Sequence, residues 1–248
     1  AGGWRIMRTL GRRIIALTGS GVSAESGVPT FRDAQTGLWA RFSPEELATP
    51  EAFARDPALV WRWYRWRREL VSRAEPNAGH RALAELEAAG TPLIVITQNV
   101  DGLHQRAGSR AVVEFHGNIT RTLCSRESCA TECTDDGGEV PRCPSCGAPA
   151  RPGVVWFGEA IPEDALAQAH AAVNECDVLM SIGTSSLVYP AAGLPPLAQA
   201  RGARIIEINP QPTPLSDQAD IVLRATSATV LPPLVEATLR LRRGSSGQ

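Results

Sequence analysis

The sequence lacks several features that mark other classes of protein. It contains no run of 18 apolar residues, which excludes a transmembrane helix, and residues 1–13 show no apolar segment of a signal peptide. The formal net charge of −1 gives no general attraction to polyanions. We therefore expect a cytoplasmic globular protein that makes no contact with a membrane and does not have nucleic acid as a partner.

Lysine is absent, so all 25 basic residues are arginine, and cysteine is confined almost to one segment. Five of the six cysteines lie between Cys124 and Cys146, and without a secretion signal such clustering favours a metal site over disulfides. Cys143 and Cys146 are spaced as half of a structural zinc site, and Cys124 and Cys129 are the predicted partner pair. The spacing of Cys133 also suits a zinc ligand and leaves this pair open. Few apolar residues lie between 125 and 142, so a metal would supply the folding free energy.

A glycine turn follows the first apolar run, residues 13–18. Gly19-x-Gly21-x-x-Ala24 has the spacing of a phosphate-binding turn, in which glycine lets the backbone approach a pyrophosphate. The acidic residue that dehydrogenases carry about 20 positions later is missing. A polar loop broken by Pro29 stands in its place, which argues against hydride transfer.

Apolar runs alternate with helical patterns along the rest of the chain. The expected strands cover residues 13–18, 93–96, 112–115, 177–182, 204–208 and 220–223, and the expected helices cover 43–73, 77–89, 163–174, 194–201 and 231–241. This alternation predicts an α/β fold, a Rossmann-like doubly wound parallel sheet with a small zinc-binding insert and a helical module. We expect the sheet domain to comprise 1–40, 76–118 and 152–243, the helical module 41–75, the zinc module 119–151 and a tail 244–248.

Polar residues cluster at the carboxyl ends of these strands. The run 93–96 ends in Gln98, Asn99 and Asp101, and the next run delivers His116. Other strands end at Gly19, Gly183 and Asn209, so four strand ends are expected to converge on one crevice. A neutral histidine there can act as a general base.

The helix within 57–73 is rich in tryptophan and arginine. Its pattern is typical of an amphipathic surface helix with aromatic anchors, and Tyr64 and Arg67 share a face because they are three residues apart. The mixture of arginine and aromatic residues could also suggest nucleic-acid binding, but the near-zero net charge argues against it.

Taken together, the segments resemble the sirtuins, the NAD-dependent protein-lysine deacylases. The matching segments cover nearly the whole chain in family order: GSGVSAESGVPTFR (19–32), TQNVDGLHQRAG (97–108), EFHGN (114–118), the cysteine insert, VVWFGE (154–159), GTSSLVYPA (183–191) and INP (208–210). Ser20 departs from the usual alanine, and Cys124-x4-Cys129 replaces the C-x2-C of many members.

The resemblance implies NAD and one structural zinc as cofactors, and acyl-lysine proteins or peptides as substrates. The residues it implies for NAD are Gly19, Ser20, Gly21, Ser23, Ala24, Glu25, Gly27, Thr30, Phe31, Arg32, Gln98, Asn99, Val100, Asp101, Gly183, Thr184, Ser185, Asn209, Pro210, Gln211 and Ser227. In the implied reaction the acyl oxygen attacks the nicotinamide ribose, nicotinamide leaves, and O-acyl-ADP-ribose forms. Asn99 and Asp101 would position the nicotinamide and its ribose, and His116 would act as general base on a ribose hydroxyl.

The helix 57–73 also resembles the sirtuin class that removes succinyl and malonyl groups, in which a tyrosine and an arginine three residues apart bind the acyl carboxylate. Tyr64 and Arg67 occupy these positions, and Val154, Val155, Phe157 and Gly158 would pair with the substrate peptide by β-addition. Alternatives are an NAD-dependent protein ADP-ribosyltransferase and a zinc-ribbon module that binds nucleic acid. Since the chain has no lysine, it cannot be its own side-chain substrate.

Overall fold

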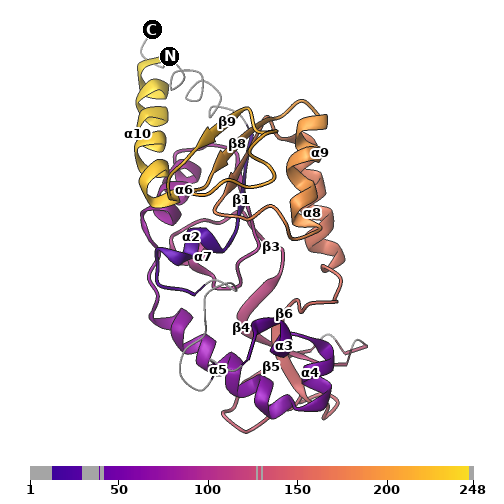
Figure 1. Ribbon diagram of the computed structural model, residues 1–248. Helices are drawn as coiled ribbons and strands as arrows, with labels where there is room; N and C mark the ends of the chain where they lie inside the picture. The colour runs from indigo at the N-terminus through magenta and orange to yellow at the C-terminus, as the bar shows by residue number, and fades with distance from the viewer. Residues whose placement is uncertain (1–12, 30–38, 40–41, 127, 130, 246–248) are drawn as a thin grey trace.

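A six-stranded parallel sheet forms the larger part of the molecule. The computed structural model describes residues 13–29, 39, 42–126, 128–129 and 131–245 (Figure 1). The strand order is β3-β2-β1-β7-β8-β9, with every neighbouring pair parallel. The strands are β1 (Ile14–Thr18), β2 (Leu93–Thr97), β3 (Val112–Glu114), β7 (Val178–Ile182), β8 (Arg204–Ile208) and β9 (Ile221–Leu223). The predicted Rossmann-like doubly wound sheet is therefore confirmed.

Helices cover both faces of this sheet, as Figure 1 shows. On one face lie α6 (Ala78–Ala88) and α10 (Ser227–Ser245), and on the other lie α8 (Glu163–Glu175) and α9 (Leu194–Ala200). Successive residues of β1 alternate between the two cores, with Ile14 packed toward α6 and α10 and Ile15 toward α8 and α9. Burial on both faces explains why the strands are continuous apolar runs.

The strand order reverses between β1 and β7, and glycine permits the close contact found there. The main-chain N–H of Gly19 donates to Ile182 O at 3.0 Å, and that of Gly21 donates to Gly183 O at 2.8 Å. A Cβ atom on Gly19 would lie 2.7 Å from Thr184 Cα, and Gly183 has a φ of +59°. The helix α2 (Ser20–Ala24) starts directly from this turn. In doubly wound sheets the ligand binds at such a switch point.

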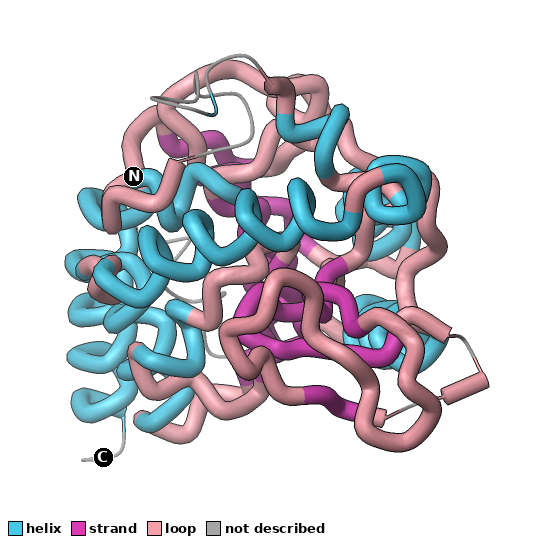
Figure 2. Tube along the Cα trace, turned by 90° about the horizontal axis from the view of Figure 1, so that it is seen from below, coloured by secondary structure: helices cyan, strands magenta, loops and turns pink. Residues whose placement is uncertain are grey.

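A smaller module lies beyond the carboxyl edge of the large sheet. Its antiparallel sheet has the order β5-β4-β6, formed by β4 (Gly117–Cys124), β5 (Glu132–Cys133) and β6 (Ala150–Val154). Next to it lie α3 (Pro44–Leu47), α4 (Pro50–Arg55) and α5 (Pro57–Arg73). Figure 2 views the molecule from this end, with helices on both sides of the strands.

Proline and capping residues define the starts of these three helices. Each begins with proline, which has no N–H to leave unsatisfied. Ser43 forms a capping box with Glu46, and the side chains of Thr49 and Asp56 cap α4 and α5. The helical region expected over 43–73, with a second helix after Asp56-Pro57, thus contains three helices, because Thr49 followed by Pro50 interrupts its first part as well.

Several elements differ from the expected ones. The eight-residue strand β4 and the short helix α7 (Leu103–Arg106) were not predicted, and the last helix begins at Ser227 instead of Leu231. β4 and β6 both extend beyond the limits expected for the zinc module, 119 and 151. A 3-10 turn, Ala191–Gly193, precedes α9.

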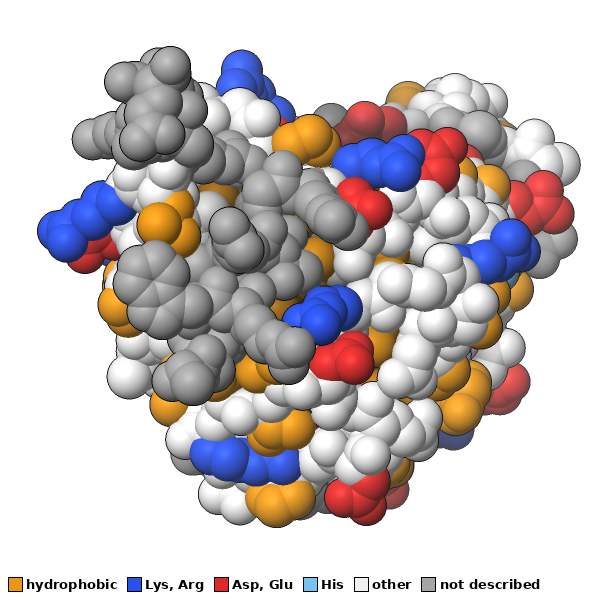
Figure 3. All heavy atoms as spheres, turned by 90° about the horizontal axis from the view of Figure 1, so that it is seen from above, with side chains coloured by type: hydrophobic (Ala, Val, Ile, Leu, Met, Phe, Trp, Pro, Cys, Tyr) orange, Lys and Arg blue, Asp and Glu red, His pale blue; other side chains and the backbone are white. Residues whose placement is uncertain are grey.

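The surface offers no single-sign field on the face seen in Figure 3, where basic and acidic side chains are interspersed. In the described part of the chain, no helix combines the length and apolarity needed to cross a bilayer.

Candidate functional site

Three polar side chains after β1 and β2 form the centre of the site. Nδ2 of Asn99 donates to the main-chain oxygen of Gly19 and to Oγ of Ser23, both at 3.0 Å. Oγ of Ser23 donates to Oδ2 of Asp101 at 2.6 Å, and Oδ1 of Asp101 accepts the N–H of Leu103 at 2.9 Å. Asp101 is buried, so these bonds fix its carboxylate. Each carboxylate oxygen keeps the capacity for a second donor.

Further contacts join the ends of β2, β7 and β8. Nε2 of Gln98 donates to Oγ1 of Thr184 at 3.0 Å, and Nδ2 of Asn209 donates to the main-chain oxygen of Thr184 at 2.9 Å. Oδ1 of Asn209 accepts the N–H of Gln211 at 3.1 Å. The structure thus brings together polar groups from strand ends far apart in the sequence.

Glu25, which follows α2, reaches the first turn of α10. Its Oε2 accepts a hydrogen bond from the hydroxyl of Ser227, at 3.3 Å from Oγ, and another from the main-chain N–H of Ala228 at 3.1 Å. A carboxylate is favourable at the amino end of a helix. This contact connects two of the predicted cofactor residues across 202 positions of the chain.

His116 follows β3 and lies against the polar strand end of β2. Its Nδ1 is 3.0 Å from the main-chain oxygen of Gln98, and its own main-chain oxygen accepts the N–H of Val155 at 2.9 Å. Burial lowers the pKa of His116 below its ordinary value, and the bond to Gln98 opposes this only in part. The imidazole is therefore neutral at physiological pH.

Two further histidines lie buried beneath the cluster. The rings of His80 and His104 have centroids 4.8 Å apart, and Nε2 of His104 is 2.9 Å from Oγ1 of Thr18. Burial lowers the pKa of His80 to about 4 and that of His104 to about 3. Nε2 of His80 and Nδ1 of His104 have no hydrogen-bond partner among the residues described. Both rings are neutral, and their contact could not be predicted from the sequence because 24 residues separate them.

Tyr64 and Arg67 lie on α5 near the same cluster. Oη of Tyr64 accepts Nε1–H of Trp156 at 3.0 Å, and burial raises the pKa of Tyr64 to about 12 although the charge of Arg67 lowers it. Burial lowers the pKa of Arg67, which the charges of Tyr64 and Asp101 raise. Arg67 is thus electrostatically coupled both to its neighbour on the helix and to the carboxylate of the strand end.

Four cysteines form a cluster at the far end of the small module. The sulfur atoms of Cys124, Cys129, Cys143 and Cys146 all lie within 4.8 Å of one another. The Sγ–Sγ distance is 3.5 Å for Cys124–Cys146 and 3.6 Å for Cys129–Cys143. A tetrahedral zinc ion with Zn–S bonds of about 2.3 Å needs sulfur atoms about 3.8 Å apart, so the cluster fits zinc. Cys133 is outside the group, and its sulfur contacts the main-chain oxygen of Thr131.

Residues 19–190 match the Sir2 family. The chain is 53% identical over 233 residues to the NAD-dependent protein deacylase 2 of Pyrobaculum aerophilum, covering 94% of this chain and 93% of the relative. It is 48% identical over 242 residues to the NAD-dependent protein deacylase of Aquifex aeolicus, covering 94% and 98%.

The chain belongs to the Sir2 family.

Solved Sir2 structures agree with this membership. A Sir2 homologue in complex with NAD superposes with a TM-score of 0.90 at 47% identity, covering 96% of this chain and 94% of the other. A Sir2 complex with a p53 peptide and NAD+ gives a TM-score of 0.83 at 32% identity, covering 94% and 95%. The sirtuin resemblance read from the sequence is therefore confirmed.

The remaining predicted residues of this Sir2 site are distributed over the same loops. Ser20, Ala24 and Gly27 lie on or after α2, Val100 lies between Asn99 and Asp101, and Ser185 and Pro210 follow β7 and β8. Thr30, Phe31 and Arg32 lie outside the described residues.

Val154, Val155, Phe157 and Gly158 connect the small sheet to this site. Val154 ends β6, and Phe157 is largely exposed. The N–H groups of Val155 and Phe157 already donate to His116 O and Ala48 O, both at 2.9 Å. These two N–H groups are therefore already used within the protein.

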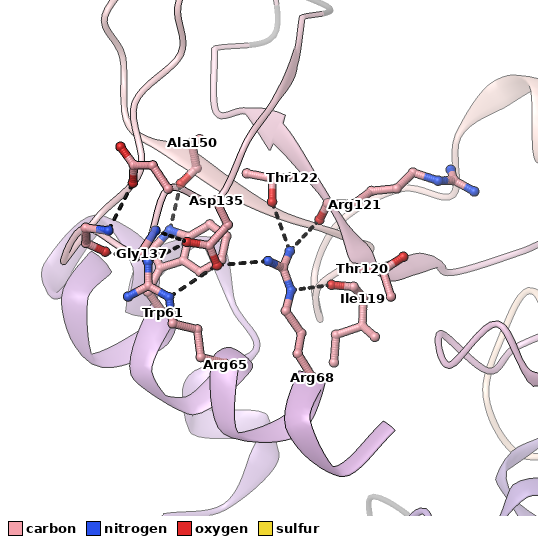
Figure 4. A network of polar contacts seen from close by, with 12 residues as sticks. Trp61, Arg65, Arg68, Ile119, Thr120, Arg121, Thr122, Asp135, Gly137 and Ala150 are labelled. Carbon is pink, nitrogen blue, oxygen red and sulfur yellow. Dashed lines mark hydrogen bonds and ion pairs between the residues drawn. The ribbon is translucent and has the colours of Figure 1, made fainter. Parts of the chain in front are cut away.

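A network missed by the sequence reasoning connects α5 to the zinc-binding end of the molecule (Figure 4). Arg65 and Arg68 both bind Asp135, with Nη2–Oδ1 and Nη1–Oδ2 distances of 2.7 and 3.1 Å. Arg68 also donates to the main-chain oxygens of Ile119 and Arg121 at 2.6 and 2.7 Å. The sequence shows that Arg65 and Arg68 are three residues apart on one helix. Their hydrogen-bond acceptors could not be predicted, because Asp135 and Ile119 are more than 50 positions away in the chain.

Proposed function

We propose that the chain is an NAD-dependent protein-lysine deacylase that removes acidic acyl groups, such as succinyl and malonyl, as well as acetyl groups. Family membership and relatives named NAD-dependent protein deacylases support the general activity. The observation that carries the acidic acyl groups is the pairing of the Tyr64 hydroxyl and the Arg67 guanidinium on one face of α5, beside the strand-end cluster.

The chemistry of the strand ends fits NAD. Gln98, Asn99 and Asp101 offer amide and carboxylate groups suited to a carboxamide and to ribose hydroxyls. Oγ of Ser186, after β7, is buried with no partner in the described part of the chain, and a polar ligand at the switch point would satisfy it. When bound, NAD supplies a ribose carbon that the acyl oxygen attacks with loss of nicotinamide, giving lysine and O-acyl-ADP-ribose after hydrolysis.

The side chains of the site would orient the reactants and move one proton. Asn99 and Asp101 are held by the Ser23 and Gly19 contacts, so their free lone pairs have fixed directions. Holding reacting groups in one geometry is worth much of the barrier when the nucleophile is a weak amide oxygen. His116, neutral because its pKa is lowered, would take the proton of a ribose hydroxyl.

The acyl carboxylate would be bound by two donors of different kinds. A guanidinium can hold a carboxylate through two charge-assisted hydrogen bonds, and a phenol adds another. Arg67 is half-buried, and burial lowers its pKa, so a carboxylate beside it would stabilise its charged form. The charge of Asp101 raises the pKa of Arg67, which supports a role for this donor beside the residues proposed for the ribose.

The test compares kcat/KM for acetyl- and succinyl-lysine peptides in the wild type and Arg67→Met. The ratio of succinyl to acetyl activity should fall about 10- to 100-fold, since a desolvated charge pair with substrate is lost. Arg62→Met is the matched control, because Arg62 is exposed on the same helix and pairs only weakly with Glu139, at 3.9 Å. An unchanged ratio in Arg67→Met would disprove the assignment of acidic acyl groups.

Mass spectrometry of the products tests the reaction type. NAD and a succinyl-lysine peptide should give nicotinamide and O-succinyl-ADP-ribose in equal amounts. Stable attachment of ADP-ribose to protein, with the acyl group retained, would instead indicate an ADP-ribosyltransferase.

A further inference from the structure

The indole of Trp156 contacts the phenol of Tyr64 in the hydrophobic cluster between α3–α5 and the small sheet. Both side chains are buried, and Nε1 of Trp156 lies 3.0 Å from Oη of Tyr64. An indole N–H can only donate, so Oη is the acceptor. The hydroxyl hydrogen of Tyr64 must then point in another direction, and no acceptor for it is found among the described residues.

A buried O–H donor without an acceptor is costly unless a ligand supplies one. Accepting a hydrogen bond also polarises a hydroxyl and makes it a stronger donor. Arg67 lies three residues further along the same face of α5 and carries a positive charge. A phenol and a guanidinium on one face of a helix are two hydrogen-bond donors, one of them cationic, and such a pair suits a carboxylate.

Trp156 itself is held on several sides. The guanidinium carbon of Arg151 lies 3.6 Å from its ring centroid, and the ring of Phe53 is 5.2 Å away between centroids. Oε2 of Glu159 accepts the main-chain N–H of Trp156 at 2.7 Å and binds Nη2 of Arg151 at 2.8 Å. These contacts hold the indole in the orientation in which its N–H donates to the hydroxyl oxygen of Tyr64.

The helix that carries Tyr64 is fixed from the opposite side as well. Trp61 donates from Nε1 to the main-chain oxygen of Ala150 at 2.8 Å, and Arg65 and Arg68 bind Asp135 (Figure 4). Trp61 is therefore a second buried indole on this helix with a hydrogen bond of the same kind, but it makes its bond to the zinc-binding module and not to Tyr64.

We propose that Trp156 is a positioning residue, which directs the hydroxyl of Tyr64 toward the acyl carboxylate and thereby favours acidic acyl groups. The inference rests on the proposed function, because it requires that Tyr64 and Arg67 bind the acyl group. Trp156 acts through Tyr64 and does not itself need to contact the substrate.

The experiment measures kcat and KM with succinyl- and acetyl-lysine peptides for the wild type, Trp156→Phe, Tyr64→Phe and the double variant. Phenylalanine keeps an aromatic ring against Phe53 and Arg151 but removes the N–H donor together with part of the ring volume, and the Trp61→Phe control accounts for that loss of volume. In Trp156→Phe, KM for the succinyl peptide should rise about three- to tenfold more than KM for the acetyl peptide. The ratio of the two KM values, succinyl to acetyl, should be the same in the double variant as in Tyr64→Phe alone, because Trp156 has no effect on this ratio without the hydroxyl of Tyr64.

Trp61→Phe is the matched control, since it removes a comparable indole hydrogen bond without touching Tyr64, and its ratio should stay within about twofold of the wild type. If Trp156→Phe does not fold, Glu159→Gln loosens the same indole and should shift the ratio in the same direction. Equal effects of Trp156→Phe on both peptides, or additive effects in the double variant, would overturn the inference. A ratio of succinyl to acetyl activity that is the same in the wild type and in Arg67→Met would instead refute the proposed function.

Discussion

His116 and Gln98 are joined by a contact that fixes the tautomer of the imidazole. Nδ1 of His116 lies 3.0 Å from the main-chain oxygen of Gln98, and a carbonyl oxygen can only accept. The proton of the neutral ring therefore resides on Nδ1, and Nε2 carries the lone pair. A base with its lone pair on a known nitrogen is what removal of a ribose proton requires.

The first prediction concerns this base. His116→Tyr should lower kcat by at least about 100-fold while leaving the fold and the zinc content unchanged. In the wild type, activity should fall as the pH drops through a value below about 6.5, because the lowered pKa keeps the ring neutral to more acidic pH. Steady-state kinetics from pH 5 to 9 provide the measurement.

The control for this prediction is His170→Asn, since His170 is exposed on α8. It should retain wild-type turnover. An acid limb above pH 7, or an active His116→Tyr variant with the same product, would contradict the role assigned to His116.

The second prediction concerns stability and the buried histidines. The pKa of His104 is about 3 in the folded protein, against about 6.5 for the unfolded chain. As pH falls below 6.5, the unfolded chain takes up a proton that the folded protein does not. Between pH 6.5 and about 3 the free energy of unfolding therefore decreases by up to about 1.4 kcal/mol for each unit by which the pH falls. The stability that the neutral His104 contributes is complete only above pH 6.5.

His104→Gln should make the fall of Tm between pH 6.5 and 4 shallower, although it should also lower Tm at pH 8 by disturbing the Thr18 contact. Thermal denaturation at several pH values gives the slope. His170→Gln, at an exposed site, should leave both the slope and Tm at pH 8 unchanged. A slope identical in His104→Gln and the wild type would refute the explanation.

The third prediction concerns the metal. Cys146→Ser should remove most of the zinc and lower Tm, because the small module gains folding free energy from the metal. Cys133→Ser should keep one zinc ion per chain, since Cys133 lies outside the group of four sulfur atoms. Zinc analysis after purification and thermal denaturation measure the two effects. Loss of zinc from Cys133→Ser, with retention in Cys129→Ser, would show that the ligand set is wrong.

The sequence predicted the parts of this molecule that depend on local pattern. Apolar β-branched runs ended by Gly19 or by Gln98 and Asn99 identify buried strands and the edge that binds a ligand, because both signals lie within a few residues. The spacing of Cys143 and Cys146 likewise identifies half of a zinc site from a four-residue segment.

Contacts between distant segments could not be predicted in the same way. Trp156 and Tyr64 are 92 residues apart, and Arg68 and Ile119 are 51 apart. Such hydrogen bonds depend on how two elements dock, which periodicity does not encode. β4 was missed because its buried positions, Asn118, Ile119, Thr122 and Cys124, do not alternate regularly and include only one aliphatic residue, so its pattern was read as part of the metal segment.

Two excursions of the chain from the large sheet supply the smaller module. Residues 19–92 intervene between β1 and β2, and residues 115–177 between β3 and β7. Within these excursions, α3 to α5 and the small antiparallel sheet take no part in the pairing of the six strands, so substitutions in these elements need not alter that pairing. The part proposed to select the acyl group can therefore diversify during evolution, while the nucleotide-binding framework keeps its geometry.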